Sequence, residues 1–193
     1  MISRKYGMVI PWPDYILHRM NIQVAAAVAA LLPGVLSGMP SHAGQAEPDA
    51  QWTYKSVDGK DLEMDVFLPD DYESGGRFPT FVVFHGGSWR KGETSWHWPD
   101  CEYWCSRGMI AASVDYRLKD RDNVEVPLEC VKDAKSAVRF LRTNARRLKI
   151  DPERIVAAGG SAGGQMAAAT AMVPGANDEH DDDSVSCEPN AVI

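Results

Sequence analysis

A Gly-x-Ser-x-Gly pattern at residues 159–163 constrains the fold of this chain more than any other feature. An apolar run at residues 155–158 precedes it, and a segment rich in alanine and methionine, residues 162–172, follows it. The run is typical of a strand buried on both faces, and the segment has the composition of a helix. This junction predicts a sharp strand-to-helix turn that presents the hydroxyl of Ser161 as a candidate nucleophile.

Gly159 and Gly163 have a steric reason to flank this serine, because side chains there would crowd a tight turn and glycine adopts angles that other residues resist. The start of the helix would also favour negative charge developing at Ser161. The alternative is a glycine-rich turn in which Ser161 only caps the helix.

A second motif lies upstream. The buried-strand run at residues 78–84 leads directly into His85-Gly86-Gly87. A His-Gly-Gly loop after a strand can offer backbone N–H groups to the oxyanion that forms in acyl transfer. The candidate donors are Gly86 and Gly87, with the N–H of Ala162 completing the set. We expect His85 to order the loop rather than to carry a proton.

With both motifs in this order, residues 51–193 resemble the esterase/lipase branch of the α/β-hydrolase superfamily, and especially bacterial acetyl-xylan and feruloyl esterases. Residues 68–69, 114–118 and 151–155 match the same pattern. The resemblance implies an α/β-hydrolase fold, with an antiparallel first hairpin followed by parallel strands with flanking helices. It departs at Ser88, where many members have a third glycine.

The triad partners are expected after the nucleophile, first an acid and then a histidine. The histidine that follows Ser161 is His180, within the acidic run at residues 177–183. Asp181 or Asp183 would then share one loop with His180, whereas a triad normally draws on separate loops. We therefore expect a solvated acidic loop here, with weak cation binding as the alternative.

Residues 191–193 predict the start of a sixth strand, beside the strand that carries the nucleophile. Members of the superfamily generally continue well past this point. The expected fold is therefore the N-terminal half of an α/β-hydrolase, incomplete at its C-terminus and without the triad Asp and His.

Residues 1–46 have the pattern of a signal peptide and short leader ahead of a partial catalytic domain at 47–193. Basic residues precede an apolar stretch at 22–36 that is too short to span a bilayer comfortably, and small residues follow at 41–43. We expect export to the periplasm or the medium and no stable membrane span. An uncleaved anchor is the alternative.

Several further elements are predicted. Residues 52–57 and 62–68 alternate around Asp58-Gly59, which indicates a hairpin. Residues 109–114 predict a strand and residues 128–148 a helix. The apolar face of that helix has three- and four-residue spacing; it comprises Val131, Ala134, Val138, Leu141 and Ala145.

Composition limits partners and cofactors. A formal net charge of −7 without a basic cluster disfavours nucleic acid. No cofactor signature is present. The four cysteines are expected to be buried or bridged thiols rather than metal ligands; they are Cys101, Cys105, Cys130 and Cys187.

Two groups near the second motif remain open. Asp115 and Arg117 are expected to form a buried polar pair with a structural role. Five aromatic residues follow the loop, and we expect packing, with stacking on a sugar or an aromatic acid as the alternative; they are Trp89, Trp96, Trp98, Tyr103 and Trp104.

The resemblance implies a secreted serine hydrolase that cleaves small-molecule or carbohydrate esters, such as acetyl or feruloyl esters, through an acyl-enzyme at Ser161. An amidase or peptidase on the same scaffold is the alternative within enzymes. A non-catalytic remnant that keeps the fold without its chemistry is the alternative outside them.

Overall fold

The computed structural model describes residues 47–193, so the predicted signal peptide and leader lie outside the described residues. The sheet begins with an antiparallel hairpin of β1 (Ala50–Val57) and β2 (Lys60–Phe67). Its turn has positive φ at both central residues, 52° at Asp58 and 75° at Gly59. This is the turn that Asp-Gly favours, so the predicted hairpin is confirmed.

The remaining strands complete a six-stranded sheet with the order β1-β2-β4-β3-β5-β6. They are β3 (Phe78–Phe84), β4 (Ile110–Val114), β5 (Ile150–Gly159) and β6 (Ala191–Val192). β2 pairs with β4 in the antiparallel direction, and every pair from β4 to β6 is parallel. The predicted sixth strand therefore forms, and it lies beside β5.

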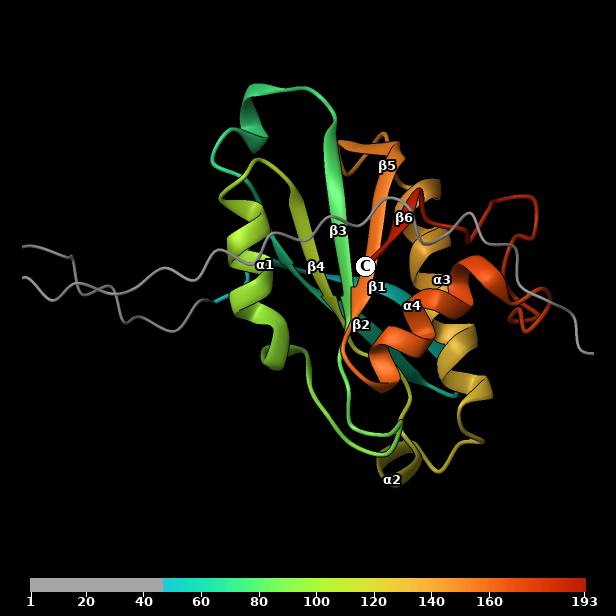
Figure 1. Ribbon diagram of the computed structural model, residues 1–193. Coiled ribbons are helices and arrows are strands. Elements are labelled where there is room, and N and C mark those ends of the chain that lie inside the picture. Colours follow the sequence, from blue (N-terminus) through green and yellow to red (C-terminus); the bar gives the residue numbers. More distant parts are fainter. Residues whose placement is uncertain (1–46) are drawn as a thin grey trace, which may run out of the picture. The chain divides into compact units, whose positions relative to one another are not determined.

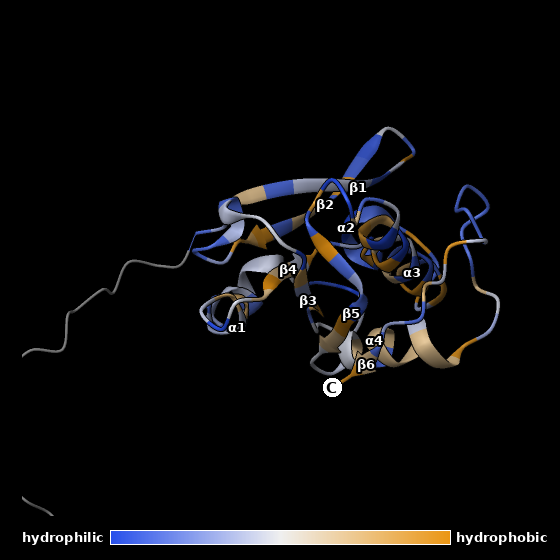
Figure 2. Cartoon of the chain, turned by 90° about the horizontal axis from the view of Figure 1, so that it is seen from above, coloured by the Kyte–Doolittle hydropathy of each residue, from blue (hydrophilic) through white to orange (hydrophobic). Residues whose placement is uncertain are grey.

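Helices cover both faces of this sheet (Figure 1). α1 (Trp98–Cys105) packs on one face, where Phe81 and Cys101 share a small apolar cluster. α3 (Leu128–Thr143) and α4 (Ala162–Met172) pack on the other face over the larger core. In Figure 2 much of α4 has hydrophobic colours, as expected of a helix packed against a sheet.

The predicted strands at 78–84 and 109–114 are confirmed, and α4 has the predicted bounds. α3 ends five residues before the predicted helix does, since the chain turns at residues 144–149 to enter β5. All five predicted apolar positions are nevertheless buried. Neither α1 nor the short α2 (Lys119–Asp122) was predicted, because α1 mixes aromatic, charged and cysteine residues and α2 is a single turn.

The predicted Asp115–Arg117 pair is wrong. The guanidinium of Arg117 donates to the fully buried carboxylate of Asp133 at 2.7 and 2.8 Å and contacts Glu129 at 2.9 Å. Asp115 instead pairs with Arg121 at 2.9 Å. Packing of α3 on the sheet supplies a partner for Arg117 that local sequence does not reveal.

The acidic run at residues 177–183 is only partly solvated. Lys55 on β1 binds Asp178 at 2.6 Å, and Arg139 on α3 binds Asp181 at 2.9 Å. The predicted solvated loop is therefore wrong for these two carboxylates, which hold the segment after α4 against α3 and β1.

All four cysteines are free thiols, and among the described residues no group of His, Cys, Asp and Glu has a metal-binding arrangement. No helix between residues 47 and 193 has the length and apolarity needed to cross a membrane.

Candidate active site

Ser161 lies at the junction of β5 and α4 in a strained backbone conformation, with φ 56° and ψ −116°. A positive φ is uncommon outside glycine and persists only when the surroundings enforce it. Here the turn is closed by Gly163 N–H, which donates to Gly160 O at 2.9 Å, and Gln165 N–H donates to Ser161 O at 3.1 Å. The residue is exposed, so its hydroxyl is accessible to a substrate.

The flanking glycines are required by close backbone contacts. A Cβ atom on Gly159 would lie 2.3 Å from the carbonyl carbon of Gly163, and one on Gly163 would lie 1.9 Å from Phe84 O. A Cβ atom on Gly160 would meet nothing within 4 Å. Close contacts therefore require glycine at positions 159 and 163 of the Gly-x-Ser-x-Gly pattern but not at position 160.

The second motif lies against the first because β3 and β5 are parallel neighbours with Phe84 in register with Gly159. A Cβ atom on Gly86 would lie 3.5 Å from the Cβ of Ser161 and 3.0 Å from Gly160 O. Parallel pairing thus brings together two segments far apart in the sequence at the carboxyl end of the sheet, where ligands bind in α/β proteins.

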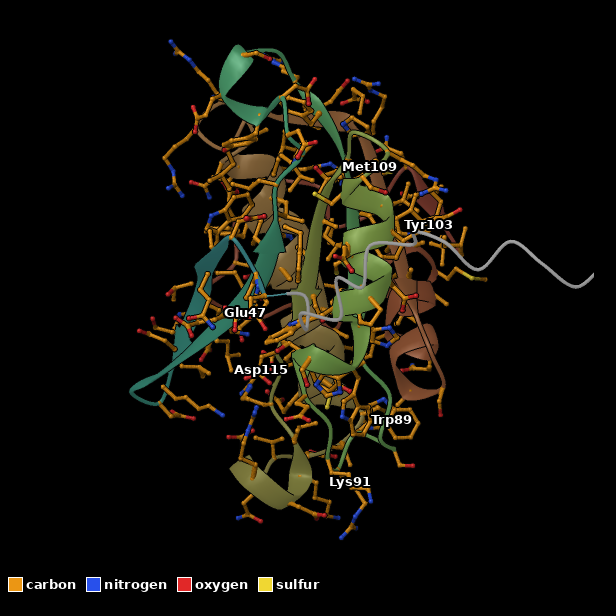
Figure 3. All side chains as sticks on the ribbon, turned by 90° about the vertical axis from the view of Figure 1, so that its left-hand side faces the viewer. Glu47, Trp89, Lys91, Tyr103, Met109 and Asp115 are labelled. Carbon is orange, nitrogen blue, oxygen red and sulfur yellow. The ribbon has the colours of Figure 1, made fainter. Side chains whose placement is uncertain are left out.

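Figure 3 shows which end of the sheet this is. Met109, just before β4, and Asp115, just after it, lie at opposite ends of the strand, and Trp89 and Lys91 lie at the end of Asp115. The loop after β3 therefore sits at the carboxyl ends of the parallel strands.

Within the described residues, the N–H groups of Gly86, Gly87 and Ala162 have no hydrogen-bond acceptor. Ala162 is the first residue of α4, whose early N–H groups have no partner inside the helix. Gly87 has φ 111°, and its carbonyl accepts from Arg90 N–H at 3.0 Å. An oxyanion site requires unpaired backbone donors beside the nucleophile, and Gly86 and Ala162 both adjoin Ser161.

His85 has a role in the loop rather than at the nucleophile. Its side chain is fully buried, its Nδ1 lies 2.8 Å from Gly86 O, and its ring stacks on Tyr116 with centroids 4.3 Å apart. Burial lowers the pKa of His85, which favours a neutral imidazole. The geometry agrees with the predicted loop-ordering role.

Ser88 and Trp89 have φ values of 56° and 58°, in the left-handed region that favours glycine. This accounts for the third glycine that the family pattern has at position 88. The chain keeps the required conformation with a serine there, at some cost in strain.

Sequence reasoning missed two residues that shape this loop. Tyr116 donates its hydroxyl to His85 O at 2.7 Å, and Gly92, with φ 134°, leaves room for the imidazole, since a Cβ there would lie 2.3 Å from His85 Nδ1. The Asp-Tyr-Arg segment after β4 was a signal for Tyr116. Gly92 had none beyond being a glycine.

No described histidine hydrogen bonds to Ser161. His85 is occupied as above, His97 binds Asp100 at 2.7 Å, and the side chain of His180 is 81% exposed. Asp181 is bound by Arg139 rather than by His180. The structure brings Ser161 together with the candidate donor Gly86 but does not bring the residues of the acidic run into a triad.

Of the five aromatic residues after the loop, Trp89 is partly buried against the larger core, and the other four divide into two groups. Trp98 and Trp104 pack against the α1 face of the sheet, the latter stacked on Phe81 at 5.4 Å. Trp96 and Tyr103 are half exposed. Packing accounts for the first group. In the second, the Arg107 guanidinium covers the Tyr103 ring at 3.5 Å, and Trp96 packs edge-on against His85 with centroids 6.1 Å apart.

Residues 64–192 match the BD-FAE family model. The chain belongs to the BD-FAE family. As the sequence predicted, it is an α/β-hydrolase of the esterase/lipase branch.

Curated relatives agree with the assignment to the esterase/lipase branch. The chain is 35% identical to carboxylesterase NlhH of Mycobacterium tuberculosis over 114 residues, which cover 58% of this chain and 34% of that protein. It is 29% identical to lipase 2 of Moraxella sp. over 153 residues, 76% of this chain and 35% of the lipase.

Among solved structures, esterase 2 of Thermogutta terrifontis phosphonylated by cyclosarin is 43% identical with a TM-score of 0.72, over 74% of this chain and 54% of that one. The propionate-bound form of the same esterase is 42% identical with a TM-score of 0.71, over 79% and 55%. This BD-FAE chain thus spans about half the length of these structures and about a third of the two curated relatives.

Proposed function

We propose that the chain contributes the nucleophile and the oxyanion donors of a serine carboxylic-ester hydrolase. The contact between Gly86 and Ser161 carries this proposal, because it puts unpaired N–H groups beside the exposed hydroxyl. The esterase and lipase relatives support the same reaction.

In the proposed reaction the Ser161 oxygen bonds to the ester carbonyl carbon, and the carbonyl oxygen becomes an oxyanion that accepts from Gly86, Gly87 and Ala162 N–H. The serine proton passes to a base, which is none of the described histidines, and the alcohol leaves with a proton. Water then attacks the acyl-enzyme and releases the acid. Each oxyanion donor contributes on the order of 3 kcal/mol to such a transition state.

The proposed substrates are esters of short acyl groups, such as acetyl esters of carbohydrates, or esters of the larger aromatic feruloyl group. The propionate and butyrate complexes of the Thermogutta esterase support a small acyl group. The half-exposed ring of Trp96, near the oxyanion loop, offers a surface for a sugar or an aromatic acid.

The test is to treat the full chain and Ser161→Ala with a fluorophosphonate probe and to assay acetate, butyrate and ferulate esters alongside an acyl anilide. Stoichiometric labelling at Ser161 with ester turnover supports the proposal, and faster anilide turnover favours an amidase or peptidase. A folded chain that neither labels nor turns over esters is a non-catalytic relative of this family.

Export through residues 1–46 is part of the proposal. Fractionation of cells that express the full chain tests it: a shortened product in the periplasm or medium supports export, and full-length protein kept inside the cell contradicts it.

A further inference from the structure

We propose that Tyr116 is a positioning residue that aims the Gly86 N–H toward the oxyanion. This inference rests on the proposed function. Tyr116 follows β4, is fully buried, and donates its hydroxyl to His85 O at 2.7 Å.

The carbonyl that Tyr116 binds and the N–H of Gly86 belong to the same peptide group. That group is planar and trans, so its C=O and N–H point in opposite directions. A hydrogen bond that fixes the oxygen on the buried side therefore fixes the hydrogen on the side of Ser161.

The next peptide group is held in the same way. Its carbonyl oxygen, Gly86 O, lies 2.8 Å from His85 Nδ1 and 3.5 Å from the Tyr116 hydroxyl, and its N–H belongs to Gly87. Gly86 O is an acceptor, so His85 Nδ1 carries the hydrogen. The tyrosine ring, stacked on the imidazole with 20° between the planes, keeps that side chain in place.

These bonds matter because the two N–H groups have no other partner among the described residues. Glycine on both sides of the 86–87 peptide leaves its rotation weakly restricted. Rotation would replace a donor by a carbonyl oxygen beside the developing negative charge, whereas oxyanion stabilisation depends on donors that are already aligned.

The tyrosine is suited to act only as a donor. Burial, assisted by the nearby Cys130 and Asp115, raises the pKa of Tyr116 well above its usual range, so the hydroxyl keeps its proton at neutral pH.

The test compares Tyr116→Phe with Tyr54→Phe in the full chain. Tyr54 is a matched control, because it is also buried and its hydroxyl also donates to a backbone carbonyl at 2.7 Å, that of Asp115. For ester hydrolysis we expect kcat to fall about tenfold in Tyr116→Phe with KM within twofold, and neither to change in Tyr54→Phe. A p-aminophenylalanine at position 116 keeps a donor and is expected to restore most of kcat.

A second measurement does not need activity. In ¹H–¹⁵N spectra, Tyr116→Phe is expected to shift the Gly86 and Gly87 amides and to speed their hydrogen exchange, and Tyr54→Phe is expected to leave both in place. If Tyr116→Phe does not fold, the variant with p-aminophenylalanine at position 116 is compared with wild type instead. Its amino group is a weaker donor than the hydroxyl, and the same shifts and exchange rates of the Gly86 and Gly87 amides are measured.

The inference is overturned if the Gly86 and Gly87 amides respond equally to both phenylalanine variants, or if an active chain keeps its kcat in Tyr116→Phe. If the wild-type chain is inactive but Tyr116→Phe gives the expected amide shifts, the proposed function is rejected. The positioning of the Gly86 N–H by Tyr116 is then still supported.

Discussion

The backbone of Gly163 lies directly against the carbonyl oxygen of Phe84, so that a Cβ atom on the glycine would sit 1.9 Å from that oxygen. Gly163 is the second residue of α4, the helix that follows Ser161, and Phe84 is the last residue of β3, the strand before His85. One backbone contact therefore sets the spacing between the two halves of the site.

This contact makes position 163 intolerant of any side chain. Gly163→Ala is expected to destabilise the fold by at least about 3 kcal/mol, because backbone on both sides must move. Gly160→Ala, where a Cβ meets nothing within 4 Å, is expected to change stability by less than about 1 kcal/mol. Urea unfolding of both variants measures the difference, and equal stabilities would contradict the contact.

Ser88 provides a test of strain in the oxyanion loop. Its φ of 56° costs a non-glycine residue about 1–2 kcal/mol, which a glycine at this position would not incur. Part of that benefit is offset because glycine has a greater conformational entropy in the unfolded chain. Ser88→Gly is therefore expected to stabilise the protein by about 0.5–1 kcal/mol. Ser106→Gly, at a residue with φ −62°, is expected to be destabilising, and thermal unfolding compares the two. A loss of stability in Ser88→Gly would rule out strain at this position.

Asp178 makes stability depend on acid pH. Burial alone would raise the pKa of Asp178, but hydrogen bonds from Lys55 and from the His180 N–H outweigh it and lower the pKa. The stabilisation is therefore present above the unfolded pKa of about 4 and is lost as the pH falls through the lower folded value. Asp178→Asn is expected to lose about 1–2 kcal/mol at pH 7 and to differ little from wild type near pH 2.

The control for that series is Glu179→Gln, whose side chain lies in the same segment and is 87% exposed. It is expected to unfold as wild type does at both pH values. A penalty for Asp178→Asn that is the same at pH 7 and at pH 2 would show that the carboxylate charge is not responsible.

His85 adds a second pH dependence near neutrality. Burial lowers its pKa, so the unfolded chain takes up a proton below about pH 6.5 that the folded imidazole does not. The free energy of unfolding is expected to be highest above pH 6.5 and to fall, by at most about 1.4 kcal/mol per pH unit, down to the folded pKa. NMR of the imidazole nitrogens is expected to show a His85 ring that is mostly neutral at pH 6.5. The variant His180→Gln is expected to keep the slope. A ring that protonates at pH 6.5 would contradict this.

The sequence predicted the parts of this fold whose cause is local. The period-two hairpin around Asp58-Gly59, the apolar run of β3 and the glycines of the nucleophile turn each have a short-range reason, and the structure has all three. One wrong prediction, the Asp115–Arg117 pair, concerned a charge whose partner comes from α3. Tertiary packing decides such pairs, and one sequence does not contain that information.

The candidate site divides in the same way. Ser161 and Gly86 were predicted as candidate site residues from their motifs, because strained turns demand particular residue types. Tyr116 was not, because the Asp-Tyr-Arg segment marked it only as part of a family pattern and gave no sign that its hydroxyl binds a distant peptide group. Asp178 and Asp181 were predicted to be solvated, because nothing in the local sequence indicates that Lys55 and Arg139 bind them.

The position of β3 between β4 and β5 has a consequence for synthesis of the chain. Both neighbours of β3 follow it in the sequence, so the oxyanion loop leaves the ribosome before either strand that will flank it, and Ser161 arrives after both. At about 5–20 residues per second, an apolar strand waits several seconds with unpaired edges. If the proposed function holds, a nascent chain first reacts with a fluorophosphonate only after β4 and β5 have paired with β3. The chain length at which labelling begins therefore reports when these strands pair.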